Sequence, residues 1–227
     1  MPTSSAKRRT RQPDITRDKL LHAAFDEIYR RGFQAASLDT ILANAGLTKG
    51  ALYHHFPDKD SLGYAVVDEV INGLLLKRWG VLEPLTGDPV TALQRTLRLR
   101  SAGLTEREVE LGCPLNNLAQ EMSPLDQRFR RAIATTFETW TDAVTRALGR
   151  GQAEGSVRAD VDASRVAAFV VASIEGSFGL AKSARSASML RSNLDVLGSF
   201  LESLRPGRKL GRKAPGKPGG SKRRKVS

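Results

Sequence analysis

The sequence predicts an all-α protein: an N-terminal three-helix module followed by a larger helical domain, with about nine helices in total. Two observations support this class. Apolar residues recur at helical spacing through residues 14–204, and no segment has a convincing strand pattern. The length of 227 residues, 40% of them hydrophobic, is enough for one large core or two small ones, and favours two.

Residues 16–31 form the first expected helix, because their apolar side chains fall on one stripe and Gly32 follows the basic pair Arg30-Arg31. Ser37 is a good N-cap for a second, short helix that Gly46 ends. A third helix follows at once and stops at Phe56-Pro57, since the residue before proline is pushed out of helical geometry. Residues 37–56 therefore have the pattern of a helix-turn-helix.

The larger domain is predicted helix by helix. Asp58 caps a long helix that runs on from the first module, and after a break at residues 84–89 a helix spans residues 90–104. A kink at residues 112–114 precedes a helix begun by Pro114, and a long helix covers residues 125–148.

The C-terminal part holds two more helices. Gly149, Gly151 and Gly155 predict a flexible connection, after which residues 162–182 are apolar nearly all round and residues 187–204 form the last helix. A helix of the first kind is buried, and we expect it to pack against another subunit.

The two ends of the chain carry the positive charge. Residues 1–13 hold four basic side chains and residues 205–227 hold ten, with no acidic residue in either, so the formal charge of +12 leaves −2 for residues 14–204. We expect a disordered basic arm and a disordered basic tail. The arm, with Lys7, Arg8, Arg9 and Arg11, is either a DNA-tracking arm or a solvated leader.

In a helix-turn-helix the second helix reads the DNA, so we interpret residues 47–56 as a DNA recognition helix. Together with the segment Thr48 to Lys59, the arrangement of residues 14–204 resembles the TetR/AcrR family of transcriptional regulators, strongly in residues 14–60 and only in architecture beyond. The resemblance implies a homodimer that reads a palindromic operator in double-stranded DNA. It also implies that residues 61–204 bind an effector and dimerise through the last two helices, about 162–204.

The candidate DNA-binding residues lie on or beside the recognition helix. Thr48 can cap it and donate to a phosphate, Lys49 can read guanine or hold a phosphate, and Gly50 allows close backbone approach. Ser37 can contact a phosphate in addition to its cap. By the family resemblance, phosphate contacts are implied for Tyr53, His55 and Lys59. The full set is Ser37, Thr48, Lys49, Gly50, Tyr53, His54, His55 and Lys59.

The larger domain contains one distinctive segment, Gly112 to Met122, which resembles a Gly-Cys-x-x-x-Asn-Leu-x-x-Glu pattern of one branch of the family. Cys113, the only cysteine, precedes the proline that begins a helix, so we expect a lowered thiol pKa there. Two interpretations stay open: Cys113 is an electrophile or redox sensor, or a small residue packed at a kink. The effector candidates are Cys113, Asn117, Trp140 and Phe178.

Other functions find little support in the sequence. There is no Walker loop or dinucleotide fingerprint, Glu175 to Gly179 lacks the first glycine of a nucleophile elbow, and no metal site or cofactor is expected. No apolar run approaches a membrane span, so we expect a cytoplasmic, nucleoid-associated regulator that is not an enzyme. The alternative is a non-specific nucleic-acid compaction protein driven by the basic tail.

Overall fold

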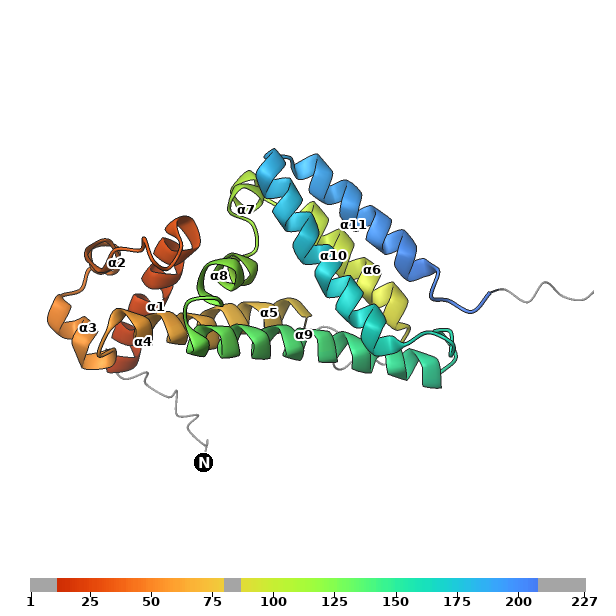
Figure 1. Cartoon of the computed structure of the whole chain (residues 1–227), viewed down its shortest axis with the longest axis horizontal. Helices are drawn as coiled ribbons and strands as arrows, with labels where there is room; N and C mark the ends of the chain where they lie inside the picture. Colours follow the sequence, from red (N-terminus) through yellow and green to blue (C-terminus); the bar gives the residue numbers. More distant parts are fainter. Residues whose placement is uncertain (1–11, 80–86, 208–227) are drawn as a thin grey trace, which may run out of the picture.

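The computed structural model describes residues 12–79 and 87–207, and every regular element in these ranges is helical (Figure 1). Most of the predicted arm and tail lies outside the described residues, as does part of the predicted break at residues 84–89. The all-α class is confirmed, with a small N-terminal module followed by a larger helical domain.

Three helices make the N-terminal module: α1 (Gln12–Arg31), α2 (Leu38–Ala45) and α3 (Lys49–His55). Both predicted N-caps are present. Ser37 Oγ accepts the Thr40 N–H at 3.3 Å, and Thr48 Oγ1 accepts the Ala51 N–H at 3.3 Å. Gly46, with φ of 65°, ends α2 in the left-handed conformation that its lack of a Cβ permits. Local chemistry therefore fixes the turn that presents α3.

A continuous helical rod joins the two domains. It consists of α4 (Lys59–Ala65), the π-helical segment η1 (Val66–Ile71) and α5 (Asn72–Trp79). Asp58 accepts the Ser61 N–H at 2.7 Å, which confirms the predicted cap. Arg17 on α1 donates to both carboxylate oxygens of Glu69 at 2.5 Å, so the first helix is tied to the rod.

The larger domain packs around α9 (Gln127–Ala153), which runs beside the rod (Figure 1). Against α9 lie α6 (Pro89–Ala102), α8 (Pro114–Met122) and α10 (Ala163–Ala184). The last helix, α11 (Ala187–Glu202), packs on α10 and α6. The short α7 (Glu106–Leu111) contacts α10 at the far end of the bundle from the rod.

Two elements differ from the sequence prediction. Helix α7 was not predicted, because its six residues bury only Val109 and show no periodicity; its local signal is the capping box of Thr105 and Glu108. Helix α9 continues to Ala153, so the prediction that Gly149 and Gly151 form a flexible connection is wrong. A Cβ on Gly151 would lie 2.5 Å from Pro89 Cγ, so this glycine allows close packing of α9 on α6.

Helix α10 is the one described helix that is long and apolar enough to span a membrane by length and composition alone. In the fold it packs between α9 and α11, as the core helix of a helical bundle does. Its buried face includes Val170, Val171 and Ile174, whereas Phe169 and Leu180 are exposed. Within the described chain, α10 is thus buried on one face only, and the expectation that it packs against another subunit stays a prediction.

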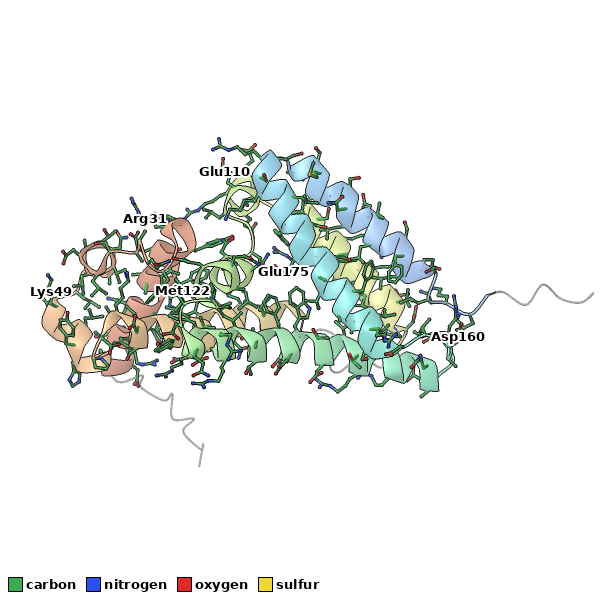
Figure 2. All side chains as sticks on the ribbon, viewed as in Figure 1. Arg31, Lys49, Glu110, Met122, Asp160 and Glu175 are labelled. Atoms are coloured by element: carbon green, nitrogen blue, oxygen red, sulfur yellow. The ribbon has the colours of Figure 1, made fainter. Side chains whose placement is uncertain are left out.

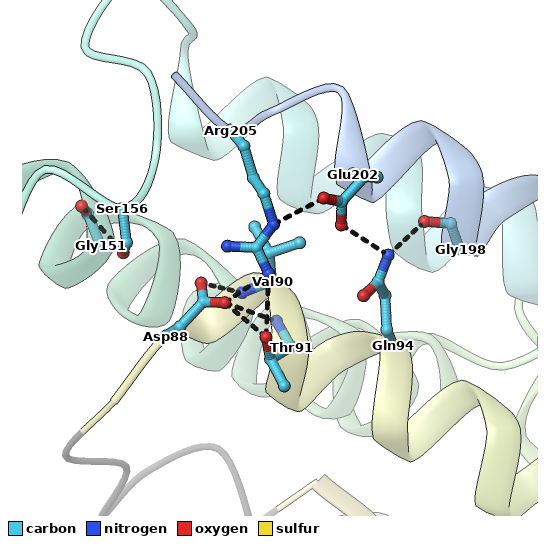
Figure 3. Close-up of polar contacts among 9 residues, drawn as sticks. All are labelled: Asp88, Val90, Thr91, Gln94, Gly151, Ser156, Gly198, Glu202 and Arg205. Carbon is cyan, nitrogen blue, oxygen red and sulfur yellow. Dashed lines mark hydrogen bonds and ion pairs between the residues drawn. The ribbon is translucent and has the colours of Figure 1, made fainter. Parts of the chain in front are cut away.

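The C-terminal end of α11 is anchored by a polar network (Figure 3). Arg205 donates to Asp88 Oδ2 at 2.5 Å and pairs with Glu202 at 2.9 Å, while Gln94 donates to the Gly198 carbonyl at 2.8 Å. Burial raises the pKa of Asp88, but hydrogen bonds from Thr91 and Arg205 outweigh it, so the pKa is lowered overall. The predicted tail therefore begins too early, because Arg205 belongs to the folded domain.

Arg205→Met is expected to lower the free energy of unfolding by about 1–2 kcal/mol, since it leaves the partly buried Asp88 carboxylate with fewer donors. Urea denaturation at neutral pH measures the change. Arg191→Met, at an exposed site on α11, is the control and should stay within about 0.5 kcal/mol of wild type. If the two substitutions lower the free energy of unfolding equally, the polar network around Arg205 does not stabilise the fold as proposed.

Candidate DNA-binding surface and effector cavity

The recognition helix α3 divides cleanly into a buried and an exposed side. Leu52 and Phe56 are 1% and 3% exposed and belong to the same buried core as Ile41 and Leu42. Thr48, Lys49, Gly50 and His54 are exposed, and Tyr53 keeps 54% of its surface open to solvent. The helix thus presents the candidate DNA-binding side chains away from the module core, with Lys49 at the outer end of the molecule (Figure 2).

Lys49 already has an intramolecular partner. Its Nζ lies 3.0 Å from Asp39 Oδ1, and this hydrogen bond raises the pKa of the lysine. Both side chains are highly exposed, so water screens the pair and its contribution to folding is small. A phosphate or guanine acceptor would compete with Asp39 for the same ammonium group.

Lys59 and the two histidines make contacts within the protein, in addition to any contact with DNA phosphates. Lys59 Nζ donates to the Gln34 carbonyl at 3.0 Å and lies 5.0 Å from the centre of the Phe33 ring, so it holds the loop after α1. The His54 and His55 rings stand 5.0 Å apart in an edge-on arrangement. Within the described ranges no group of three His, Cys, Asp or Glu side chains is placed to hold a metal ion.

A small cavity of about 40 Å³ lies where both domains meet, with room for one or two water molecules. Three of the four effector candidates, Cys113, Trp140 and Phe178, line it. Asn117 does not: it lies in the neighbouring open groove, donating to the Leu111 carbonyl at 2.7 Å and accepting from Lys182 at 3.0 Å. Its contacts close the turn between α7 and α8.

The cavity also contains polar residues that the sequence did not single out. Glu175 on α10 is 7% exposed, and its carboxylate raises the pKa of the Cys113 thiol. Arg100 pairs with Glu108 at 3.6 Å. Leu75 of the rod and Tyr29 of α1 complete the wall on the side of the N-terminal module. The available signal for Glu175 was a single carboxylate within an otherwise uncharged run from Val166 to Leu180.

The expected low pKa of Cys113 is wrong. Cys113 is the N-cap of α8 and its sulfur faces the backbone N–H groups of Asn116 and Leu115, which favour the thiolate. Burial is the larger influence, and with the nearby Glu175 carboxylate it raises the pKa of the thiol far above its ordinary value. The thiol is therefore protonated at neutral pH, and the helix-terminus effect is outweighed.

This raised pKa predicts a pH-dependent stability difference between wild type and Cys113→Ser. Below about pH 8.5 the thiol is protonated in both folded and unfolded chains, so the difference is constant. Above it, only the unfolded thiol ionises, and wild type loses up to about 1.4 kcal/mol per pH unit relative to the serine variant. Urea denaturation at pH 7.5, 8.5 and 9.5 measures this, and a pH-independent difference would contradict the assignment.

Comparisons with known proteins agree with this geometry. Residues 20–66 match the model of bacterial regulatory proteins of the tetR family, and residues 89–194 match the C-terminal domain of LmrA/YxaF-like transcriptional regulators. The HTH-type transcriptional repressor DhaR of Mycobacterium sp. (strain GP1) is 29% identical over 181 residues, covering 80% of this chain and 89% of its own. The transcriptional regulator AcuR of Cereibacter sphaeroides is 29% identical over 173 residues, covering 74% and 77%.

Solved structures show the same fold over nearly their whole length. The crystal structure of the regulatory protein TetR from Rhodobacter sphaeroides superposes with a TM-score of 0.73 at 26% identity, covering 82% of this chain and 98% of that one. Reduced NemR of E. coli has a TM-score of 0.73 at 21% identity, covering 84% and 97%. With its helix-turn-helix and its C-terminal helical domain both matched, this chain belongs to the TetR family of sequence-specific, DNA-binding transcriptional regulators.

Proposed function

We propose that this regulator is a homodimeric repressor that leaves a palindromic operator when a small molecule occupies the cavity. One observation carries the proposal: Leu75, in the cavity wall, belongs to the same continuous rod whose first turn follows α3. A molecule that widens the cavity pushes on this rod and moves the recognition helix. Ligands of ordinary size need about 300–1,000 Å³, so binding requires the cavity of about 40 Å³ to expand.

The exposed apolar face of α10 and α11 supports dimerisation through residues 162–204. Phe169, Leu180 and Val196 are 52%, 60% and 67% exposed, and Phe169 stacks edge-on against Phe200 of the neighbouring helix. Apolar side chains gathered on one face favour contact with the same face of a second copy, which relates the two α3 helices by a twofold axis. A palindromic DNA site has the matching symmetry.

Val196→Asp is expected to weaken the dimer at least about tenfold, because it places a charge in an apolar interface between two copies. Sedimentation velocity over a concentration series measures the dissociation constant. Arg191→Asp on the same helix, at a residue already charged, should weaken it less. A monomeric wild type, or a dimer indifferent to Val196→Asp, would contradict this placement of the interface.

A small-molecule effector is favoured over an electrophile by the state of Cys113. The thiol is buried and protonated, whereas reactive cysteines are exposed thiolates. The test compares release of DNA by wild type and Cys113→Ser after treatment with a quinone or an enal. Equal release by the two proteins excludes Cys113 as the sensor, and release by wild type alone would establish it.

Deletion of residues 208–227 separates a specific repressor from a compaction protein driven by the basic tail. The deletion begins after Arg205 so that the network at Asp88 stays intact. A repressor keeps its footprint on a selected operator, and a compaction protein loses most of its binding and of its salt dependence. Retained sequence-specific binding supports the proposal. Such binding is expected of a regulator that acts on the chromosome in the cytoplasm.

A further inference from the structure

The helix-turn-helix, residues 37–56, contains one acidic and one basic side chain when its histidines are counted as neutral. These are Asp39, in the first turn of α2, and Lys49, the first residue of α3. The fold brings the two together, with Lys49 Nζ 3.0 Å from Asp39 Oδ1. The element proposed to face DNA therefore has no net charge, and its charged groups form a single pair.

The stability of the fold gives little reason for this pair. The exposed fraction of the side chain is 77% for Asp39 and 68% for Lys49, so water screens their attraction. A cation at the start of a helix is unfavourable, because the N-terminus of a helix carries a partial positive charge. Lys49 has this unfavourable position on α3. Its placement thus suits the binding of an outside group better than the stability of its own helix.

Asp39 competes unequally against the two kinds of acceptor that DNA offers to Lys49. The ammonium group has three N–H donors, and Asp39 Oδ1 occupies one of them. A phosphate that binds Lys49 also lies near the Asp39 carboxylate, and the two negative charges repel each other. A base edge is uncharged, so it can use the two remaining N–H donors and Asp39 Oδ2 without that repulsion. The pair therefore favours a base over a phosphate.

Among the base pairs, G·C matches these two side chains most fully. In the major groove guanine presents two acceptors, O6 and N7, and its partner cytosine presents the N4–H₂ donor. Lysine donates to the guanine acceptors, and aspartate accepts from cytosine N4. Adenine offers a lysine only N7, since its N6–H₂ group is itself a donor. A lysine and an aspartate held side by side thus find all their partners in one G·C pair.

We propose that Asp39 is a specificity-determining residue, which joins Lys49 in reading one G·C base pair in each half-site and keeps the lysine from binding phosphates at other sequences. Asp39 accepts from cytosine N4–H₂ while Lys49 donates to guanine O6 and N7. The protein thereby loses affinity for DNA in general and gains preference for its operator. This role rests on the proposed reading of an operator by α3, and it adds a residue of α2 and the identity of one base pair.

The test begins with the operator that full-length wild type selects from random-sequence DNA. Base pairs at equivalent positions of the two half-sites are exchanged in turn between G·C and A·T, and fluorescence anisotropy measures the dissociation constant. Wild type should lose at least about tenfold in affinity at one G·C position. Asp39→Asn and Lys49→Ala should each reduce the loss at that same position to less than about threefold. Asp26→Asn, at an exposed aspartate of α1, is the matched control and should keep the loss of wild type.

A duplex with the operator sequence scrambled measures affinity for DNA in general. Asp39→Asn should bind it at least about threefold more tightly than wild type, because the lysine is released to bind a phosphate. The slope of affinity against salt concentration should steepen by about one phosphate contact. If Asp39 serves only to stabilise the start of α2, neither quantity changes.

A modified operator tests the same contact without any protein variant. Replacement of the guanine at the identified position by 7-deazaguanine removes the N7 acceptor and keeps the base pair. Wild type should lose at least about threefold in affinity, and Lys49→Ala should lose none.

The role of Asp39 would be overturned if Asp39→Asn and Lys49→Ala altered the preference at different positions or at none. An unchanged affinity of Asp39→Asn for scrambled DNA, or a wild type indifferent to 7-deazaguanine, would overturn it as well. These outcomes leave specific DNA binding by the protein standing. If wild type enriches no sequence, the proposed function itself fails, and the role of Asp39 with it.

Discussion

Gly63→Ala is expected to destabilise the protein by about 2 kcal/mol or more, although alanine normally stabilises a helix relative to glycine by about 1 kcal/mol. Gly63 is buried in α4 where the two domains meet. A Cβ there would lie 2.3 Å from Phe33 Cε2 and 2.7 Å from Phe129 Cζ. Both are ring atoms of rigid side chains, so relief requires movement of the backbone.

The two rings have little freedom to move aside. Phe129 is fully buried, with its centroid 4.7 Å from Phe33 and 4.7 Å from Tyr64. The Tyr64 hydroxyl in turn donates to Asp126 Oδ2 at 2.8 Å, and this bond raises the pKa of Tyr64 to about 12. The rings thus form a closed contact between α4, the loop after α1 and the start of α9.

Gly73→Ala is the matched control, because Gly73 lies further along the same rod and no atom lies within 4 Å of its added Cβ. It should stabilise the protein by about 0.5–1 kcal/mol. Urea denaturation of both variants measures the two changes. Stabilisation by both substitutions would show that Phe33 and Phe129 yield, and that the contact between the domains is loose.

Lys49→Ala combined with Tyr53→Ala is expected to weaken operator binding about 100-fold or more, since each removes an exposed side chain of α3 from the DNA-facing surface. The free energy of unfolding should stay within about 1 kcal/mol of wild type, because neither side chain belongs to the core. Fluorescence anisotropy with a selected operator measures affinity, and urea denaturation checks the fold.

The single variant Lys49→Ala distinguishes a side chain that contacts a base from one that contacts a phosphate. If Lys49 contacts a base, Lys49→Ala relaxes the sequence preference at one position of the site; if it holds a phosphate, affinity falls uniformly and the salt slope drops by about 1. Lys19→Ala, an exposed lysine on α1, is the control and should change affinity less than about threefold. If the double variant binds the operator with wild-type affinity, α3 does not belong to the DNA interface.

The sequence predicted the elements whose cause is local. Ser37, Thr48 and Asp58 each cap a helix by accepting an N–H three residues ahead, and Gly46 turns the chain at the end of α2. These interactions involve neighbours in the sequence, so residue type and order suffice to find them. The division of α3 into a core side and an open side follows from the same local spacing.

The site in the larger domain depends on contacts that the local pattern does not contain. The neighbours of Cys113 include Glu175 and Tyr29, which come from distant helices. The burial of Cys113, together with the Glu175 carboxylate, raises the pKa that was expected to be low for a thiol at a helix start. Asn117 and Glu121 likewise find their partners in other elements. Their residue types indicated an unusual segment, and only the fold shows that it joins the two domains.

Selection from random-sequence DNA tests the central claim, that α3 of a symmetric dimer reads a specific site. Full-length wild type and the Lys49→Ala/Tyr53→Ala variant are each carried through the same rounds, and the enriched pools are sequenced. We expect wild type to enrich an inverted repeat and the variant to enrich none. Enrichment of no sequence by wild type, or of the same repeat by the variant, would contradict the assignment of α3 as the element that reads DNA.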